Sequence, residues 1–406
     1  MSAQPQSDSE QFDSETGDHL LHVNMGPQHP STHGVLRLEL DLDGEIVRRC
    51  KPVIGYLHSG MEKTCEMLKY VQVVTITDRM DYLNPLGNNL AYALAVEKLM
   101  GCEIPERAQI LRVLLAELTR INSHLVSIGS GSIDLGVTSV FLYCLREREA
   151  VLDLFEELTG ARMMGSFIRP GGLLTDANDQ WLRNCRKFVD SMPGHLDEYE
   201  DIVTDNPFFK ERTVGIGMLR ADEAIRLGVS GPLLKAAGVA HDIRKSNPYS
   251  GYEKFDFKVV TDTGADCYAR YKVRMGELRE AVKICDQALR MLGEVKGPVQ
   301  TSDRKVMPPP KSELAKSMEA VIHHFKLWTE GMKPPVGQAW ASVESPRGEL
   351  GFMVASDGSG KPLRIRARTP SFCNLQAIEH MAKGGSVADL VAIIATIDPV
   401  MGDVDR

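Results

Sequence analysis

The chain has 406 residues, of which 43% are hydrophobic, so it is long enough to bury a large core in one helical assembly or in two or three domains. Its formal net charge of -8 argues against nucleic acid as the main partner, because binding phosphates requires a concentrated positive field. No run of about 18 apolar residues predicts a bilayer-spanning helix, and the acidic, polar N-terminus lacks a secretion signal, so we expect a protein on the cytosolic side.

Cysteine spacing argues against a metal centre held by this chain alone. No two of the eight cysteines fall within a CxxC or similar short spacing, which zinc sites and iron-sulfur clusters usually show. We interpret them as small buried apolar residues. They are Cys50, Cys65, Cys102, Cys144, Cys185, Cys267, Cys285 and Cys373.

The first half of the chain predicts a small sheet followed by a helical bundle. Residues 1–19 are polar and are expected to be disordered, and residues 20–55 read as short strands that include a hairpin around Asp43-Gly44. Residues 56–205 are expected to form the bundle. Its helices are predicted over Met61 to Val74, Pro85 to Met100, Pro105 to Ile128, Thr138 to Leu158 and Asp176 to Ile202, with a break over Gly129 to Gly136 between the third and the fourth.

The second half is more mixed. Residues 206–270 lose helical periodicity and predict a loop-rich connection, and residues 271–338 predict a helical pair, over Tyr271 to Leu292 and Ser312 to Trp328. Residues 339–406 predict a hairpin around Asp357-Gly358 and short helices over Asn374 to Met381 and Val387 to Ile394. The fold class expected from these elements is α+β, mainly α.

The stretch Met25 to Gly34, MGPQHPSTHG, combines two histidines with two prolines. Each proline fixes its own φ and biases the preceding residue away from helix, so His29 and His33 are predicted to lie on a constrained loop. Such a loop can aim a titratable side chain at a ligand, but a tight hairpin with solvated histidines explains the same residues.

Common nucleotide and hydrolase motifs are missing. Neither GIGMLR at Gly215 nor DGSGKP at Asp357 fits a dinucleotide or phosphate loop, and no GxSxG elbow occurs. The pair His323-His324 is interpreted as partly exposed and not as a metal site. Arg364, Arg366 and Arg368 share one face of a predicted strand, which suits either a solvated face or contact with an acidic surface.

Two breaks between helices carry further candidates. TDRMDYLNP places Tyr82 where a phenol could be buried yet reachable, and GSGSIDLG places Asp134 between the two strongest helices. Each signal is weak alone, because a tyrosine is usually a packed core residue and Asp134 could simply cap a helix.

Five motifs together resemble one family. GPQHPSTHG, GYLHSGMEK, TDRMDYLNP, FIRPGG and SPRGELG resemble the D subunits of bacterial respiratory complex I, the proton-pumping NADH-quinone oxidoreductase, a family that includes the mitochondrial 49-kDa subunit. The resemblance covers about Leu20 to Arg406. This family is in turn similar to the large subunit of nickel-iron hydrogenases, which implies the same kind of fold.

The hydrogenase thiolates are absent. Hydrogenases hold their metals with RxCGxC and DPCxxCxxH, and the corresponding stretches here are Arg79 to Leu83 and Asp398 to Arg406. Met80, Leu83, Val400 and Asp403 take the places of the four cysteines and cannot form a soft four-sulfur site, so a nickel enzyme is excluded on coordination chemistry. Glu62 and the SPRG stretch remain as scaffold, and no metal is expected.

The resemblance implies that the former metal cavity receives a quinone headgroup. His33 and Tyr82 match the family's pair of donors to the two carbonyl oxygens, and both are expected to act in catalysis. Asp134 matches the acidic partner of this histidine and a link to proton pumping, whereas His29 is expected to support the loop. Met80, Val400 and Asp403 are expected to line the quinone site. The sequence leaves open whether the acceptor is ubiquinone or menaquinone.

The resemblance also implies partners. Electrons from NADH would arrive through FMN and iron-sulfur clusters held by other subunits, with Arg79 and Arg162 near the last cluster. The expected partners are the B, C and I subunits and the H subunit of the membrane arm, with the chain peripheral to the inner membrane on its cytoplasmic side and active only in the complex. A non-catalytic scaffold subunit of the same or a related hydrogenase-like complex remains the alternative.

Two residues depart from the family pattern. Met164 stands in GARMMGSFIRPGG where relatives often carry a histidine tied to the pH dependence of the cluster potential, and Ser59 replaces an arginine common in relatives. We therefore predict a cluster potential nearly independent of pH near neutrality. A redox titration with a slope near one proton per electron would reject this prediction.

Overall fold

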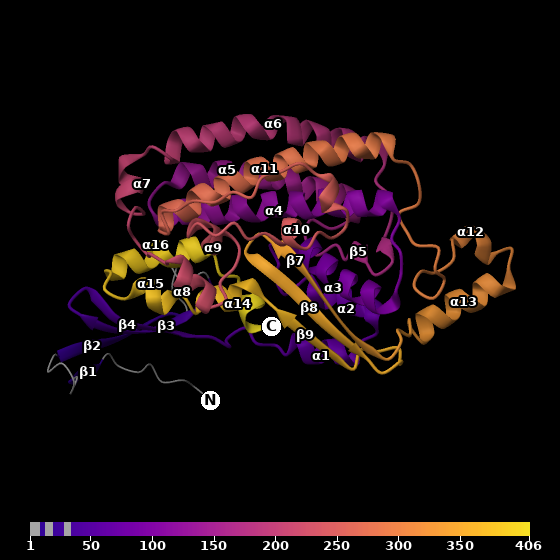
Figure 1. The fold of residues 1–406 in the computed structure, drawn as a ribbon, viewed down its shortest axis with the longest axis horizontal. Coiled ribbons are helices and arrows are strands. Elements are labelled where there is room, and N and C mark those ends of the chain that lie inside the picture. The colour runs from indigo at the N-terminus through magenta and orange to yellow at the C-terminus, as the bar shows by residue number, and fades with distance from the viewer. Residues whose placement is uncertain (1–8, 13–18, 28–33) are drawn as a thin grey trace.

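The computed structural model describes residues 9–12, 19–27 and 34–406. Long helices lie side by side in the upper layer of Figure 1, with the C-terminal strands and short helices beneath them and the N-terminal sheet at the lower left. Helices α12 and α13 stand apart at the right. The α+β, mainly helical fold class is confirmed.

The N-terminal sheet is antiparallel, in the order β1-β2-β3-β4. Its strands are β1 (Ser9–Phe12), β2 (His19–Met25), β3 (Arg37–Asp43) and β4 (Ile46–Val53). Strand β1 lies within the segment expected to be disordered. The predicted hairpin is confirmed, since Gly44 has the φ of 60° that its turn requires. Leu38, Leu40 and Leu42 alternate along β3 and are buried, as the period of a half-buried strand demands.

Five long helices build the body. They are α3 (Pro85–Met100), α4 (Glu106–Asp134), α5 (Thr138–Thr159), α6 (Asp179–Val203) and α11 (Cys267–Glu294). Local chemistry sets two of their starts, since Asn178 accepts a hydrogen bond from Trp181 N and Asp266 accepts one from Ala269 N. Among the helices of the described residues, none has both the length and the apolar composition needed to cross a bilayer.

The predicted break at Gly129 to Gly136 is wrong, because α4 continues through it to Asp134. The glycines there allow close packing. A Cβ on Gly129 would lie 3.2 Å from the Cβ of Cys144 on α5. Contact between helices therefore overrides the low helix propensity of glycine and serine. The helix ends at Asp134, and Gly136, whose φ is 86°, turns the chain after the C-cap Leu135.

Three predicted helices are each divided, and one of them, expected over Asn374 to Met381, falls in α14 (Pro370–Leu375) and α15 (Ile378–Ala382). Of the other two, the first is α1 (Met61–Met67) and α2 (Tyr70–Thr77), separated where Leu68 is extended. The second is α12 (Lys311–Leu314) and α13 (Met318–Thr329), because Ser317 adopts an extended conformation and accepts a hydrogen bond from Ala320 N as a new N-cap.

Short elements fill the remainder. Those between α5 and α11 are β5 (Ile168–Arg169), β6 (Gly172–Leu173), α7 (Pro207–Glu211), α8 (Ala221–Arg226), α9 (Pro232–Ala236), α10 (Ile243–Ser246) and η2 (Tyr252–Lys254). The C-terminal elements are β7 (Gly337–Ser345), β8 (Gly348–Ser356), β9 (Arg364–Arg368), α14 (Pro370–Leu375), α15 (Ile378–Ala382), α16 (Val387–Ile397) and α17 (Met401–Asp405). The second predicted hairpin is the β8-β9 pair.

Candidate functional site

The C-terminal helix α17 packs directly against the turn between α2 and α3. A Cβ added to Gly402 would lie 2.7 Å from Met80 O and 3.7 Å from Tyr82 Cδ1. The residue therefore has to be small for the two segments to touch. The structure thus brings together the RMDYL and DPVMGDVDR stretches, which are more than 300 residues apart in the sequence.

Tyr82 lies at the edge of this contact with 36% of its surface exposed, whereas Met80, Val400 and Asp403 are buried. Burial raises the pKa of the Tyr82 phenol, while the Arg347 guanidinium acts in the opposite direction. Within the described residues, the Tyr82 hydroxyl makes no hydrogen bond. A neutral, reachable phenol is therefore available as a donor.

The buried Arg347 holds together the segments that surround Tyr82. Arg347 Nη1 lies 3.0 Å from Asp81 Oδ2 and donates to Ser123 Oγ at 3.0 Å, and Nη2 lies 2.9 Å from Asp398 Oδ2. Burial alone would lower the pKa of this guanidinium, but Asp398 and Asp81 outweigh it and raise the pKa. Arg347 stays charged and connects the turn, α4 and the start of the C-terminal stretch.

Asp403 lies near Arg347 but, unlike Asp81 and Asp398, forms no ion pair with its guanidinium among the described residues. Its Oδ2 accepts a hydrogen bond from Ser371 N at 3.1 Å, and its buried Oδ1 has no partner among the described residues. Burial and the neighbouring Asp81 raise its pKa to about 7. Such a group exchanges its proton near neutrality, so it can take up or release one close to Tyr82.

Asp134 is the last residue of α4 and is half-buried. The histidine expected to pair with it, His33, lies with His29 outside the described residues. The base of that loop is closed, since a Cβ on Gly26 would lie 2.1 Å from Leu36 O. The pairing of Asp134 with His33 therefore stays a prediction.

The two arginines expected near a partner's cluster lie on the surface. Arg79 Nη1 donates to Thr75 O, and Arg162 is bound to Glu149 at 2.6 Å and lies 3.5 Å from Asp153. Their segments are joined by Ser166, whose backbone N donates to Asp78 Oδ2 at 3.0 Å. The loop that carries Arg162 and Met164 and leads into FIRPGG therefore packs against the turn that precedes Tyr82.

The GYLHSG loop is held by the end of the chain. Gly55 N and Leu57 N donate to the two oxygens of Asp405 at 2.8 and 2.7 Å, and His58 Nδ1 lies 2.7 Å from Asp405 O. Ser59 itself is exposed.

The three arginines of β9 form ion pairs within the chain. Arg364, Arg366 and Arg368 pair with this chain's own Glu66, Glu62 and Glu349 at 3.0, 3.1 and 3.5 Å. The acidic surface that they contact is therefore intramolecular.

Six of the cysteines are buried, and Cys102 and Cys373 are half-buried. Across the described residues, no group of three or more His, Cys, Asp or Glu side chains is arranged to hold a metal.

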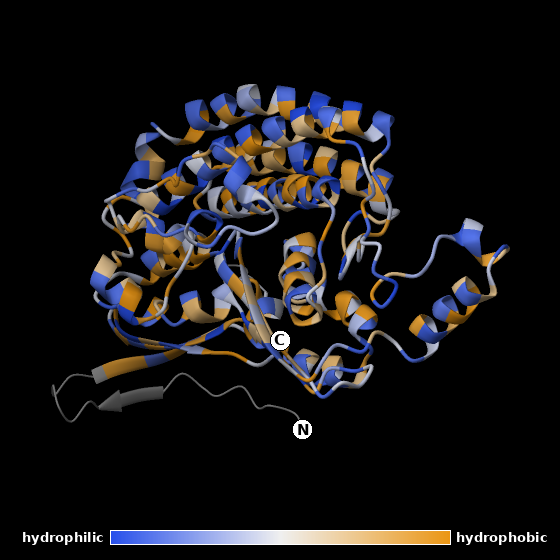
Figure 2. Cartoon of the chain, turned by 45° about the vertical axis from the view of Figure 1, so that its right-hand side comes forward, coloured by the Kyte–Doolittle hydropathy of each residue, from blue (hydrophilic) through white to orange (hydrophobic). Residues whose placement is uncertain are grey.

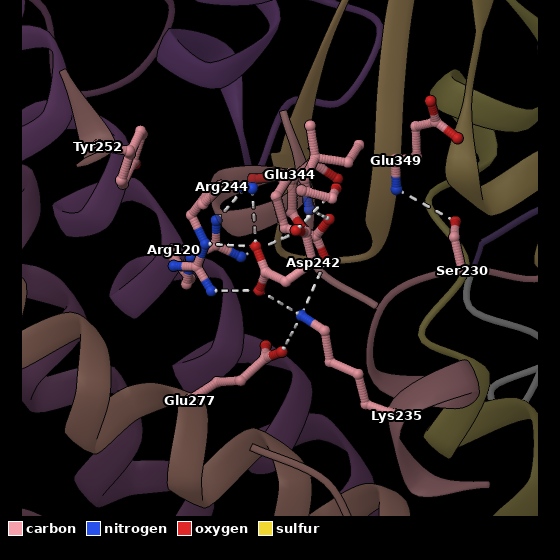
Figure 3. Close-up of polar contacts among 12 residues, drawn as sticks. Arg120, Ser230, Lys235, Asp242, Arg244, Tyr252, Glu277, Glu344 and Glu349 are labelled. Carbon is pink, nitrogen blue, oxygen red and sulfur yellow. Dashed lines mark hydrogen bonds and ion pairs between the residues drawn. The ribbon is translucent and has the colours of Figure 1, made fainter. Parts of the chain in front are cut away.

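Sequence reasoning missed a second buried cluster, centred on Lys235 (Figure 3). Lys235 Nζ lies 2.8 Å from an oxygen of each of Asp242, Glu277 and Glu344. All three donors of the ammonium group are thus used. Burial alone would raise the pKa of Glu277, but Lys235 and His124 outweigh it and lower the pKa.

The Lys235 cluster is connected through α4 to the strand end that precedes Arg347. Arg120 binds Glu117 at 3.0 Å and donates to the carbonyls of Glu344 and Ser345, at 2.6 and 3.2 Å, two residues before Arg347. The available signal was the row of charged residues inside the apolar pattern of α4. The apolar stripe of α4 predicts the helix but not these charge pairs.

Comparisons with known proteins show the family of the chain. Residues 134–406 match the family model for the 49-kDa subunit of respiratory-chain NADH dehydrogenase. The chain is 59% identical to the second of the numbered D subunits of NADH-quinone oxidoreductase in Chloroflexus aurantiacus, over 95% of this chain and 94% of that protein. It is 52% identical to the D subunit of the same enzyme in Geotalea uraniireducens, over 95% of this chain and 99% of that protein. The chain therefore belongs to the 49-kDa subunit family of respiratory-chain NADH dehydrogenase, whose bacterial members are the D subunits of NADH-quinone oxidoreductase.

Proposed function

We propose that this chain forms the headgroup end of the site at which the complex reduces quinone. The observation that carries the proposal is the contact between α17 and the Met80–Tyr82 turn, which leaves the Tyr82 phenol reachable and without a hydrogen bond among the described residues. The resemblance to nickel-iron hydrogenases implies that the same two stretches hold the metal in that family. Met80, Val400 and Asp403, which correspond by resemblance to thiolate positions of the hydrogenases, belong to these two segments and are buried.

The chemistry required at this site is proton supply. Reduction of a quinone to a quinol takes two electrons and two protons, and the carbonyl oxygens lie on opposite sides of the ring. Tyr82 would donate to one oxygen and His33 to the other, with Asp134 stabilising the protonated imidazole. Protonation of this histidine and its change of partner would be the link to proton translocation.

Electrons would come from NADH through FMN and iron-sulfur clusters in partner subunits. Because Ser166 ties the Arg162 segment to the turn that carries Arg79, one surface could face the last cluster while Tyr82 faces the quinone. We place the B, C and I subunits and the H subunit of the membrane arm around the chain, at the cytoplasmic side of the inner membrane.

A photoreactive quinone tests the proposal in the assembled complex. We expect labelling within residues 79–83 or 400–403 that excess natural quinone prevents. A chain that stays unlabelled while other subunits are labelled would support the scaffold alternative instead.

A further inference from the structure

The segment of residues 302–333, which we call the arm, stands away from the helical body (Figures 1 and 2). It carries α12 and α13. Lys69 anchors its end, donating from Nζ to Trp328 O at 2.8 Å and to Thr329 O at 2.6 Å. Ala320 is the one fully buried residue of α13.

Helix α13 has two apolar faces, and one of them is uncovered. Ala320 is buried and Leu327 packs against the core, so both face inward, whereas five large apolar side chains recur at helical spacing on the other face. Their exposed fractions are 75% for Met318, 42% for Val321, 48% for Ile322, 65% for Phe325 and 51% for Trp328. Single exposed apolar residues are ordinary, but a continuous helical stripe of five marks a binding surface.

The backbone hydrogen bonds of a helix as short as α13 do not keep it folded without packing against a neighbour. Isolated helices shorter than about 12 to 15 residues are marginal in water, and α13 has 12 residues with little burial on its inner face. The outer stripe therefore gains most from a partner that covers it.

The stripe continues into a recess where the arm meets the body. A cavity of about 200 Å³ is lined mainly by apolar side chains, among them Val71, Leu174, Met307, Trp328 and Met332. Trp328 belongs to both the stripe and the cavity. A partner lying along α13 could thus insert a side chain here.

The arm carries a net positive charge, which favours a binding partner with acidic side chains. The arm has six Lys and Arg against four Asp and Glu, a net charge of +2 in a chain of net charge -8. Its Glu313 and Glu330 are paired with Arg304 and Lys333. Exposed lysines of the arm that form no ion pair with a described carboxylate are Lys305, Lys311, Lys316 and Lys326.

We propose that the outer face of α13 docks another protein subunit of the complex, one that presents an apolar strip bordered by carboxylates. Apolar side chains would fill the strip and the cavity, and the lysines would pair with the border.

The position of the arm favours a protein over an anionic membrane. Arg107, at the start of α4, donates to Leu292 O and Val295 O, so the arm leaves α11 beside that end of α4. Asp134 lies at the other end, roughly 42 Å away for 29 residues at about 1.5 Å each. This step rests on the proposed function, in which Asp134 belongs to the quinone site: if that site opens toward the membrane that holds the quinone, the arm lies at the far end of α4 from the opening.

Site-specific photo-crosslinking in the purified, assembled complex tests the proposal. Benzoylphenylalanine in place of Phe325 preserves an aromatic ring, and the matched control places it at Glu319, which is 84% exposed beside the stripe. We expect at least tenfold more crosslink from position 325, to an apolar peptide of another subunit. A carbodiimide should join Lys316 or Lys326 to carboxylates of that same subunit.

Phe325→Ser should lower recovery of that subunit with the chain at least tenfold, while Glu319→Gln leaves recovery unchanged. Crosslinks to lipid, to a second copy of this chain or to no protein would each overturn the proposal. Quinone labelling at residues 79–83 or 400–403 is read separately in the same preparations. Its loss would contradict the proposed function without affecting the crosslinking result.

Discussion

Asp403 gives the site a titratable group whose pH dependence is opposite to that of an ordinary ion-paired carboxylate. Its pKa is raised from 3.8 to about 7 in the folded chain, so the folded state holds the proton more tightly than the unfolded chain does. The folded state is therefore favoured at low pH and loses stability as pH rises between these two values.

Asp403→Asn imitates the protonated form and should remove this loss. Relative to the natural chain, we expect its free energy of unfolding to gain up to about 4 kcal/mol between pH 4 and pH 8, since each pH unit is worth about 1.4 kcal/mol. Denaturant unfolding at several pH values measures this gain. Asp205→Asn, on an 87% exposed side chain, is the control, and a pH-independent difference for Asp403→Asn would contradict the assignment.

At the level of elements, the fit of α17 against the Met80–Tyr82 turn is the contact on which the site depends. Gly402→Ala should gain helix propensity yet clash with Met80 O, where the new Cβ would lie at 2.7 Å. We expect a net loss of about 1 to 3 kcal/mol of stability and weaker quinone binding.

The matched control for this change is Gly194→Ala in α6, where nothing lies within 4 Å of the added Cβ. That substitution should stabilise by up to about 1 kcal/mol. Thermal unfolding and the KM for quinone separate the two variants. An unchanged KM for Gly402→Ala would show that the contact does not shape the site.

Most elements follow from local patterns, but their boundaries follow from packing. The stripe of α4 and the hairpin glycines were sufficient to predict those elements. The end of α4 was not predictable, because Gly129 and Gly131 look like a linker until the facing Cys144 and Ala395 are known. No local pattern joins Tyr82 to Gly402. Only the resemblance to hydrogenases predicts that their two stretches meet, and the fold brings them into contact.

At the level of the whole molecule, the Lys235 cluster (Figure 3) joins α4, α9, α11, β7 and Asp242, the N-cap of α10. Its members are distant in sequence, and no short motif contains them. Sequence patterns predict helices and strands, but they do not indicate which buried charges will meet.

Lys235→Met should leave Asp242, Glu277 and Glu344 buried without their shared cation. We expect a loss of at least about 3 to 5 kcal/mol, seen as failure to accumulate folded protein. Lys98→Met, at an exposed lysine that donates to Trp340 O, should change stability by less than about 0.5 kcal/mol. A stable, folded Lys235→Met chain would show that the cluster is dispensable.

The most direct test of the quinone site is Tyr82→Phe in the assembled complex, with Tyr143→Phe on α5 as the matched loss of a hydroxyl. If the Tyr82 phenol donates to the quinone, its loss should lower quinone-dependent turnover by about 10²-fold or more while the spectra of the partners' iron-sulfur clusters stay unchanged. Tyr143→Phe should retain full turnover. Normal turnover in Tyr82→Phe, with the clusters intact, would contradict the assignment.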